Sequence, residues 1–269
     1  MSKNLSQKII DDLEKVGFPV EVAISSDLEN QNWAVYNGAL FEDSDESKTR
    51  EIDVHAVDVD FSLANKVKGQ TKRGNENKLI SHLIIEVKKS DKPWIFFDNG
   101  RPSWPEIPSQ NLKSEKEDFP SLFDDLKGLG LKEHRYIRAK LHKSYHVAFT
   151  KPSDPSMIYE ALVKPAKALS YFKEHYGIGG YVLHLFTPVV VFDGSLWSAS
   201  LDRRGKVKLK SVDHLFVLFG QLTKDKNEKI TYEEDQICDF VTRETFTNYL
   251  KLLKHDNKEI YKAWTNWVK

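Results

Sequence analysis

The chain of 269 residues lacks the features that mark several large classes of protein. Its only cysteine is Cys238, so an internal disulfide is excluded and a reducing compartment, the cytoplasm, is expected. No apolar run approaches the roughly 20 residues that a membrane-spanning helix needs. The first residues are polar and contain no signal-peptide core. No internal repeat is visible. We therefore expect a globular protein that does not enter a membrane.

Net charge is also missing. Lysine and arginine together number 40, and so do aspartate and glutamate, which gives a formal net charge of zero. A surface that is basic on average is excluded, so any contact with nucleic acid must rely on local positive charge. The chain is 40% hydrophobic and 30% charged, which is ordinary for a globular protein. Its length suits one large domain or two small ones.

Hydrophobic periodicity predicts an α/β protein with a mixed central β-sheet flanked by helices. The first helix is expected at 5–16 and ends at Gly17, and a long helix at 155–176 contains Pro165. A last helix begins at Thr242. The expected strands are 18–24, 33–41, 50–61, 79–87, 94–97, 181–192, 196–201, 206–222 and 230–241. Asp193-Gly194 is predicted to form the turn of a hairpin between two of these strands.

Two segments interrupt this pattern. Residues 63–77 are rich in lysine and glycine and are expected to form an exposed or poorly ordered loop. Residues 99–120 contain four prolines, which argues against regular structure there, and a short helical piece is expected near 122–126. We therefore interpret 1–269 as one domain with a core at 1–98 and 151–201. An insertion occupies 99–150, and the C-terminal strands and helix occupy 202–269.

One group of residues carries a chemical signal. Asp53 lies inside an apolar strand, and Glu86 and Lys88 lie in another. Because side chains alternate along a strand, Glu86 and Lys88 are expected on one face and Val87 on the other. If the two strands pair, Asp53 and Glu86 meet across the ladder. Two carboxylates in an apolar setting repel each other, so burying them together costs free energy. A divalent cation such as Mg²⁺ or Mn²⁺ removes that cost.

Asp53 followed by Glu86-Val87-Lys88 resembles the signature of the PD-(D/E)xK nucleases, the restriction-endonuclease-like superfamily. The resemblance covers roughly residues 5–98 well and extends more weakly to 155–192. It implies Mg²⁺-dependent cleavage of a DNA phosphodiester. Asp53, Glu86 and the Val87 carbonyl would then bind the metal. Lys88 would handle the attacking water or the charge that develops in the transition state.

The sequence also departs from the family pattern. The gap between Asp53 and Glu86 is longer than in the shortest members. Many members carry a glutamate on the first helix that assists the metal, and the nearest residues here are Gln7 and Glu14. Some carry a glutamine on the later helix, where Lys164 or Lys167 lies. These differences leave the number of metal ions open.

Basic residues suggest where nucleic acid binds. Lys66, Lys68, Lys72 and Arg73 lie between the two motif strands, and Arg203 and Arg204 flank a turn at Gly205. Each group either contacts DNA phosphates or is a solvated loop. His142 and His146 have the spacing of metal ligands on a helix, although no cysteine or Glu-x-x-His partner supports zinc.

The expected function is that of a metal-dependent DNA endonuclease, as a restriction or antiviral-defence effector. A homodimer and a regulatory protein partner are consistent with the resemblance. The alternatives are a catalytically silent or partner-gated module that binds nucleic acid or protein, and an RNA-cutting enzyme of the same fold.

Overall fold

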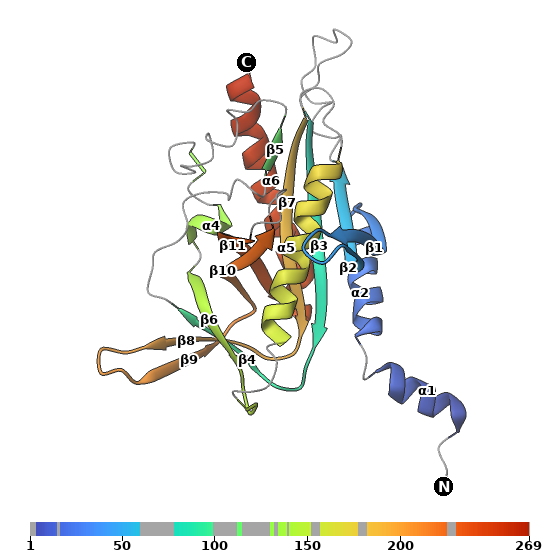
Figure 1. Ribbon diagram of the computed structural model, residues 1–269, viewed down its shortest axis with the longest axis vertical. Helices are drawn as coiled ribbons and strands as arrows, with labels where there is room; N and C mark the ends of the chain where they lie inside the picture. Colours follow the sequence, from blue (N-terminus) through green and yellow to red (C-terminus); the bar gives the residue numbers. More distant parts are fainter. Residues whose placement is uncertain are drawn as a thin grey trace.

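The computed structural model describes residues 4–14, 17–59, 78–98, 112–114, 130–131, 134–138, 140–151, 157–176, 182–224 and 230–268. Within these ranges the strands form one eleven-stranded sheet with helices packed on it (Figure 1). This confirms the predicted α/β class with a mixed sheet, flanking helices and a C-terminal helix. No described helix is long and apolar enough to cross a membrane.

The strands lie in the order β1-β2-β3-β7-β11-β10-β6-β4-β8-β9, with β5 paired to β7. Antiparallel pairing joins β1, β2 and β3, whereas β3–β7 and β7–β11 are parallel. The sheet is therefore mixed. Its elements are α1 (Leu5–Leu13), α2 (Phe18–Glu29), β1 (Ala34–Asp43), β2 (Lys48–Val59), β3 (Lys78–Lys89), β4 (Trp94–Asp98), β5 (Leu112–Ser114), α4 (Arg135–Arg138), β6 (Leu141–Val147), α5 (Met157–His175), β7 (Val182–Asp193), β8 (Leu196–Leu201), β9 (Val207–Ser211), β10 (His214–Lys224), β11 (Ile230–Thr242), η3 (Arg243–Thr245) and α6 (Phe246–Val268).

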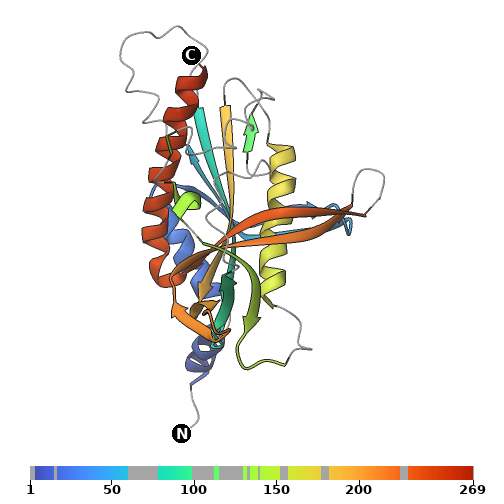
Figure 2. The same ribbon diagram turned by 90° about the vertical axis from the view of Figure 1, so that its left-hand side faces the viewer.

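Helices cover the two faces of the sheet (Figure 2). Side chains of β7 show which helix lies on which face, since they alternate along the strand. Val190 and Phe192 pack with α5, whereas Val189 and Val191 pack with α2 and α6. The two faces thus bury separate apolar cores, and a side chain on the α5 face is separated by the sheet from α2 and α6.

The prediction of a strand at 18–24 was wrong, because this segment begins helix α2. Val20, Val22 and Ile24 fit an alternating pattern, but Val20, Ile24 and Leu28 also fit a helical spacing of four residues. The structure buries those three and leaves Val22 53% exposed. Pro19 lies in the first turn, where its missing amide costs nothing. Burial of one helical face therefore decides in favour of a helix over a strand.

The predicted hairpin at Asp193-Gly194 was also wrong. Strand β7 pairs with β3 and β11, while β8 pairs with β4 and β9. At Gly194 the chain moves to another part of the sheet and passes close to Ser90, because a Cβ built on Gly194 would lie 2.5 Å from the Ser90 carbonyl oxygen. Glycine is the residue that permits this approach. The single strand expected at 206–222 is divided into β9 and β10.

Several predictions fall on residues outside the described ranges. They are the exposed loop at 63–77, the helical piece at 122–126 and most of 99–120. Of the expected insertion, the described parts include β5, α4 and β6. Strand β6 lies within the sheet, between β10 and β4.

Candidate active site

The first candidate residue, Asp53, lies where the alternation of strand β2 breaks. Val54 packs with α2 and α6, whereas Ile52, only two residues away, packs against α5. Two residues apart, these side chains belong on one face of a regular strand. On the neighbouring strand, Gly38 has a positive φ of 61° and lies between the partners of Val54 and Ile52. The distortion in both strands places Asp53 at a special position in the sheet, with its side chain 15% exposed.

The second motif strand, β3, has the geometry that its sequence predicted. Lys88 Nζ lies 2.5 Å from Glu86 Oε1, so the two side chains share one face. Val87 packs on the opposite face, in the core against α2 and α6. Glu86 is nearly inaccessible, with 1% of its side chain exposed, while Lys88 is 29% exposed. An acid is thus held at the base of the site, and an amine reaches toward solvent.

A hydrogen bond between the motif strands brings Asp53 to β3. The β2–β3 ladder extends from Val59–Ile80 to Val54–Ile85 and stops before the two acids. Beyond it, the Val87 amide donates to Asp53 Oδ2 at 2.7 Å. The amide and carbonyl of one strand residue point to the same edge. We therefore expect the Val87 carbonyl on the edge that faces Asp53.

Lys164 of α5 joins the two carboxylates. Its Nζ lies 3.0 Å from Asp53 Oδ1 and 2.7 Å from Glu86 Oε2. Burial would lower the pKa of Lys164, but the negative charges of Glu86 and then Asp53 raise it overall. The pKa of Glu86 is raised by burial and by Asp53, while Lys88 and Lys164 oppose this rise. Both acids therefore contact the ammonium of Lys164, and Glu86 contacts that of Lys88 as well.

Glu21 of α2 is a further acid near this group that the sequence interpretation missed. Its pKa is raised by burial and then by the charge of Asp53. The resemblance implied a glutamate on the first helix, for which Gln7 and Glu14 were the nearest residues. In the structure the charge of Asp53 instead reaches Glu21 of α2. The signal was present in the spacing of Val20 and Ile24, which places Glu21 on a helix, but that segment was interpreted as a strand.

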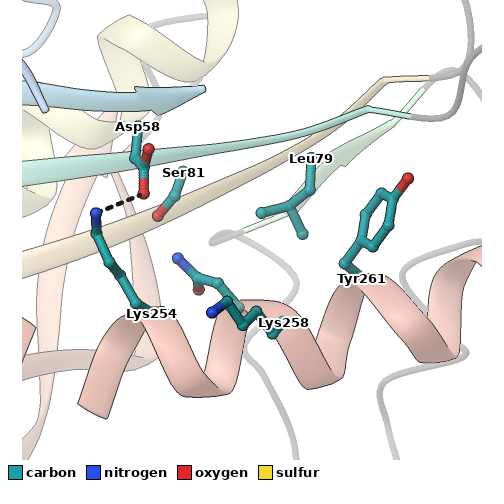
Figure 3. A pocket seen from close by; sticks show the side chains of 7 residues that line it. Asp58, Leu79, Ser81, Lys254, Lys258 and Tyr261 are labelled. Atoms are coloured by element: carbon teal, nitrogen blue, oxygen red, sulfur yellow. Dashed lines mark ion pairs between the residues drawn. The ribbon is translucent and has the colours of Figure 1, made fainter. Parts of the chain in front are cut away.

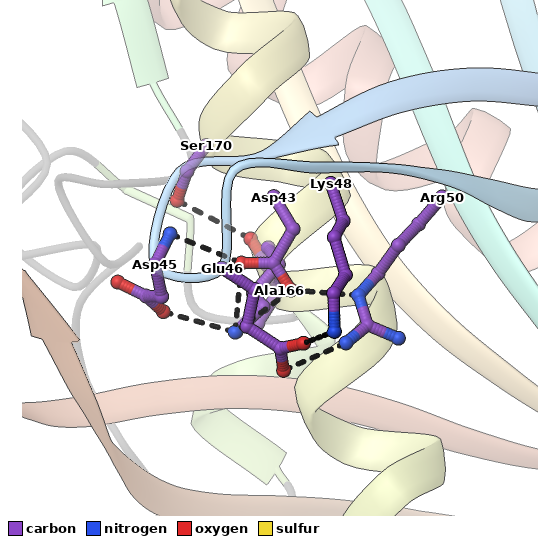
Figure 4. Close-up of polar contacts among 8 residues, drawn as sticks. Asp43, Asp45, Glu46, Lys48, Arg50, Ala166 and Ser170 are labelled. Atoms are coloured by element: carbon purple, nitrogen blue, oxygen red, sulfur yellow. Dashed lines mark hydrogen bonds and ion pairs between the residues drawn. The ribbon is translucent and has the colours of Figure 1, made fainter.

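A cluster of charged residues fixes the β1–β2 turn to α5 beside the site (Figure 4). Lys167 contacts Asp43 at 2.9 Å and Asp45 at 2.9 Å, and Arg50 contacts Asp43 at 2.7 Å and Glu46 at 2.7 Å. Burial would raise the pKa of Asp43, but Lys167 and Arg50 lower it overall. Asp43 is 1% exposed, so its charge needs these partners. This cluster ties the first strands to the helix that carries Lys164.

The site opens into a cleft of about 470 Å³ between α5 and the first strands. Glu86, Lys88 and Lys164 line it together with Tyr159 of α5 and the β1–β2 charged cluster. A cleft of this volume admits a nucleotide-sized group. Its lining has both signs of charge, so phosphate oxygens would meet Lys88 and Lys164, and a cation would meet Glu86.

The donor set fits a hard divalent cation. Asp53 Oδ1 and Glu86 Oε2 already approach one cationic atom, and the Val87 carbonyl faces the same edge. Oxygen ligands of this kind suit Mg²⁺ or Mn²⁺. Within the part of the chain that the structure describes, no cluster of three or more His, Cys, Asp or Glu side chains forms a metal site. A metal centre here would therefore rely on two carboxylates and a carbonyl.

The structure describes only some of the basic residues that were predicted to bind DNA. Lys66, Lys68, Lys72 and Arg73 lie outside the described residues. Arg203 and Arg204 are exposed in the β8–β9 turn, in a hairpin that extends away from α5 (Figure 1). The turn is stabilised by Asp202 Oδ1, which accepts from the amides of Arg204 at 2.8 Å and Lys206 at 3.0 Å. Their contact with DNA stays a prediction.

The histidine pair does not lie on a helix. His142 and His146 belong to strand β6, where the expected helical spacing does not apply. His142 contacts Ser198 Oγ at 2.8 Å and the Phe216 carbonyl oxygen at 3.3 Å, and it is buried. Cys238 is fully buried.

A small cavity lies on the other face of the sheet (Figure 3). Its lining includes Asp58, Ser81 and, from α6, Lys254 and Tyr261. Lys254 Nζ lies 3.7 Å from Asp58 Oδ2. The cavity volume is about 20 Å³, which is enough for a water molecule but not for a substrate. The cleft beside Glu86 is therefore the better candidate for an active site.

Comparison of the chain with family models, with curated proteins and with solved structures found no match. The residues of the site and their geometry are therefore the basis for a functional proposal.

Proposed function

We propose that the chain is a Mg²⁺-dependent endonuclease that hydrolyses phosphodiester bonds in DNA, with a site of the PD-(D/E)xK type. The observation that carries the proposal is the convergence of Asp53 and Glu86 on the ammonium of Lys164. Glu86, Lys88 and Lys164 line an open cleft. The sheet with helices on both faces is consistent with a restriction-endonuclease-like fold. A restriction or antiviral-defence role is the biological setting that we favour.

Each residue has a role in this proposal. Asp53, Glu86 and the Val87 carbonyl would hold the metal, which when bound polarises a phosphoryl oxygen and acidifies water. The Val87 amide fixes the Asp53 carboxylate through its hydrogen bond, so the ligand is oriented in advance. Lys88 reaches from buried Glu86 into the cleft, where its amine meets a phosphate oxygen or the attacking water. Arg203 and Arg204 would bind phosphates of the DNA backbone at a distance from the scissile bond.

The test is cleavage of plasmid, linear duplex and single-stranded DNA and of RNA, each with Mg²⁺ or Mn²⁺. Asp53→Asn and Lys88→Ala are compared with Lys89→Ala, a matched control in which the adjacent lysine is removed. Loss of cleavage by at least about a hundredfold in the first two variants, with the control active, supports the site. Cleavage that survives in both variants overturns it, and cleavage of RNA alone changes the substrate.

A second candidate is a silent or partner-gated module that uses the same fold to bind nucleic acid or protein. The observation that favours it is Lys164, whose ammonium contacts both carboxylates and compensates their charge. Calorimetric titration separates the two candidates, because a silent module binds no Mn²⁺ in a manner that depends on Asp53 and Glu86.

A further inference from the structure

Lys164 is held at the point where the two acids of the site meet. Its Nζ contacts Asp53 Oδ1 at 3.0 Å and Glu86 Oε2 at 2.7 Å, whereas Lys88 contacts the other oxygen of Glu86. The ammonium therefore uses the oxygen of each carboxylate that the Val87 amide and Lys88 leave available. A divalent cation bound at these two oxygens would lie close to the ammonium and repel it.

Burial makes a positive counter-charge at these two carboxylates necessary. The Glu86 side chain is 1% exposed, and Asp53 is 15% exposed, so both carboxylates have little water around them. Two such charges without a counter-ion repel each other and lose solvation. Lys164 supplies the compensating charge. A divalent cation at the same oxygens would supply it instead and would repel the ammonium.

We propose that Lys164 is an internal counter-ion that competes with the divalent metal, so that metal binding displaces it and its presence sets the metal concentration at which the site is loaded. This inference rests on the proposed function, because it concerns the cation of the same site. Lys164 is 30% exposed and lines the cleft, so the displaced ammonium has open space to enter.

Helix α5 offers a matched control. Lys167 lies one turn further along the same helix and contacts Asp43 and Asp45 rather than the two site acids. Its removal takes away one lysine from the same helix and the same cleft. An effect on metal affinity that comes from general charge alone would appear equally in both variants, whereas competition for Asp53 and Glu86 would appear only at Lys164.

The experiment is calorimetric titration of Mn²⁺ into the wild-type chain and into Lys164→Met, Lys167→Met and Asp53→Asn. We expect Lys164→Met to bind Mn²⁺ at least about tenfold more tightly, Lys167→Met to stay within about twofold of wild type, and Asp53→Asn to lose binding. Without metal, Lys164→Met should melt at a lower temperature than wild type, and Mn²⁺ should raise its melting temperature by a larger increment.

The outcomes separate the two proposals. If Asp53→Asn weakens binding while Lys164→Met binds as wild type or more weakly, the competition is overturned and the metal site stands. If no variant binds Mn²⁺, the metal-dependent function fails, and the competition fails with it. Lys164→Gln, which keeps a neutral hydrogen-bond donor of similar length, replaces Lys164→Met if that variant does not fold, and the same increase in affinity is expected.

Discussion

The backbone amide of Val87 donates a 2.7 Å hydrogen bond to the carboxylate of Asp53, at the point where the ladder between their strands has ended. One side chain therefore replaces the next ladder bond and holds the two motif strands together. The same contact orients Asp53 so that its other oxygen reaches Lys164 at 3.0 Å. The Asp53 carboxylate thus contributes to stability through its hydrogen bond and, in the proposed function, to activity as a metal ligand. Substitutions can separate these two contributions.

We predict that Asp53→Asn and Asp53→Ala differ in stability but not in activity. Asparagine keeps an oxygen that accepts from the Val87 amide and loses the charge, so its free energy of unfolding should stay within about 1 kcal/mol of wild type. Alanine leaves the amide unpaired, which should cost about 1–3 kcal/mol. Both should abolish metal-dependent cleavage. Urea denaturation checks the stabilities, and equal stability of the two variants would contradict this account of the hydrogen bond.

Glu21 gives a second prediction. Because its carboxyl is close enough to Asp53 for that charge to raise its pKa, Glu21→Gln should reduce cleavage by about tenfold and weaken Mn²⁺ binding by a similar factor. The control is Glu29→Gln at the other end of the same helix, which should change neither. Cleavage rates over a series of Mn²⁺ concentrations provide the measurement. A Glu21→Gln variant with unchanged rate and metal dependence would remove Glu21 from the site.

The sequence predicted the part of the candidate site that depends on residues close together in the chain. Alternation along one strand was enough to place Glu86 and Lys88 together, and the structure confirms it. Lys164 lies 111 residues from Asp53, and no local pattern shows which turn of α5 faces that acid. Only the packing of α5 on the sheet decides between Lys164 and Lys167.

The error at 18–24 has a different cause. Val20, Val22 and Ile24 satisfy a strand, and Val20, Ile24 and Leu28 satisfy a helix, so the two periods coexist in one short segment. Whether the segment forms a strand or a helix depends on which of its side chains are buried in the core, and this is decided by the packing of the whole fold. Because Glu21 lies in this segment, the same error concealed a residue of the candidate site.

The buried charges around Asp239 lead to a prediction about stability. Asp239 Oδ2 lies 3.2 Å from Arg135 Nε and accepts from Tyr249 Oη at 2.7 Å, and Asp239 is fully buried. Asp239→Ala leaves Arg135, which is 4% exposed, with Asp256 as its remaining acidic partner at 3.0 Å. Loss of one partner of a buried pair costs about 3–5 kcal/mol.

Urea denaturation checks this prediction, with Asp193→Ala as the control. Asp193 is 36% exposed and lies 3.5 Å from Lys89, so its removal should cost less than about 1 kcal/mol. If Asp239→Ala were no more damaging than Asp193→Ala, the network would contribute little to stability.

Three histidines on neighbouring strands make stability depend on pH. His55 Nε2 lies 3.3 Å from His82 Nδ1, and His82 Nε2 lies 2.9 Å from His184 Nδ1. Burial lowers the pKa of His55 to about 4, and burial followed by the charge of Lys113 lowers that of His184 to about 4. The pKa of His82 is also well below its ordinary value of 6.5, through burial and its two histidine neighbours. Charging any of these rings therefore opposes folding.

The unfolded chain takes up protons near pH 6.5, whereas the folded chain resists them until about pH 4. Stability should thus be full above pH 6.5 and fall progressively between pH 6.5 and 4, by about 3 kcal/mol for each of His55 and His184. Urea denaturation at a series of pH values, compared with His55→Phe and with His184→Phe, measures this loss. Each variant should show a shallower fall over that range, because one titrating group is gone. An equally steep fall in both variants would assign the acid sensitivity to groups elsewhere in the protein.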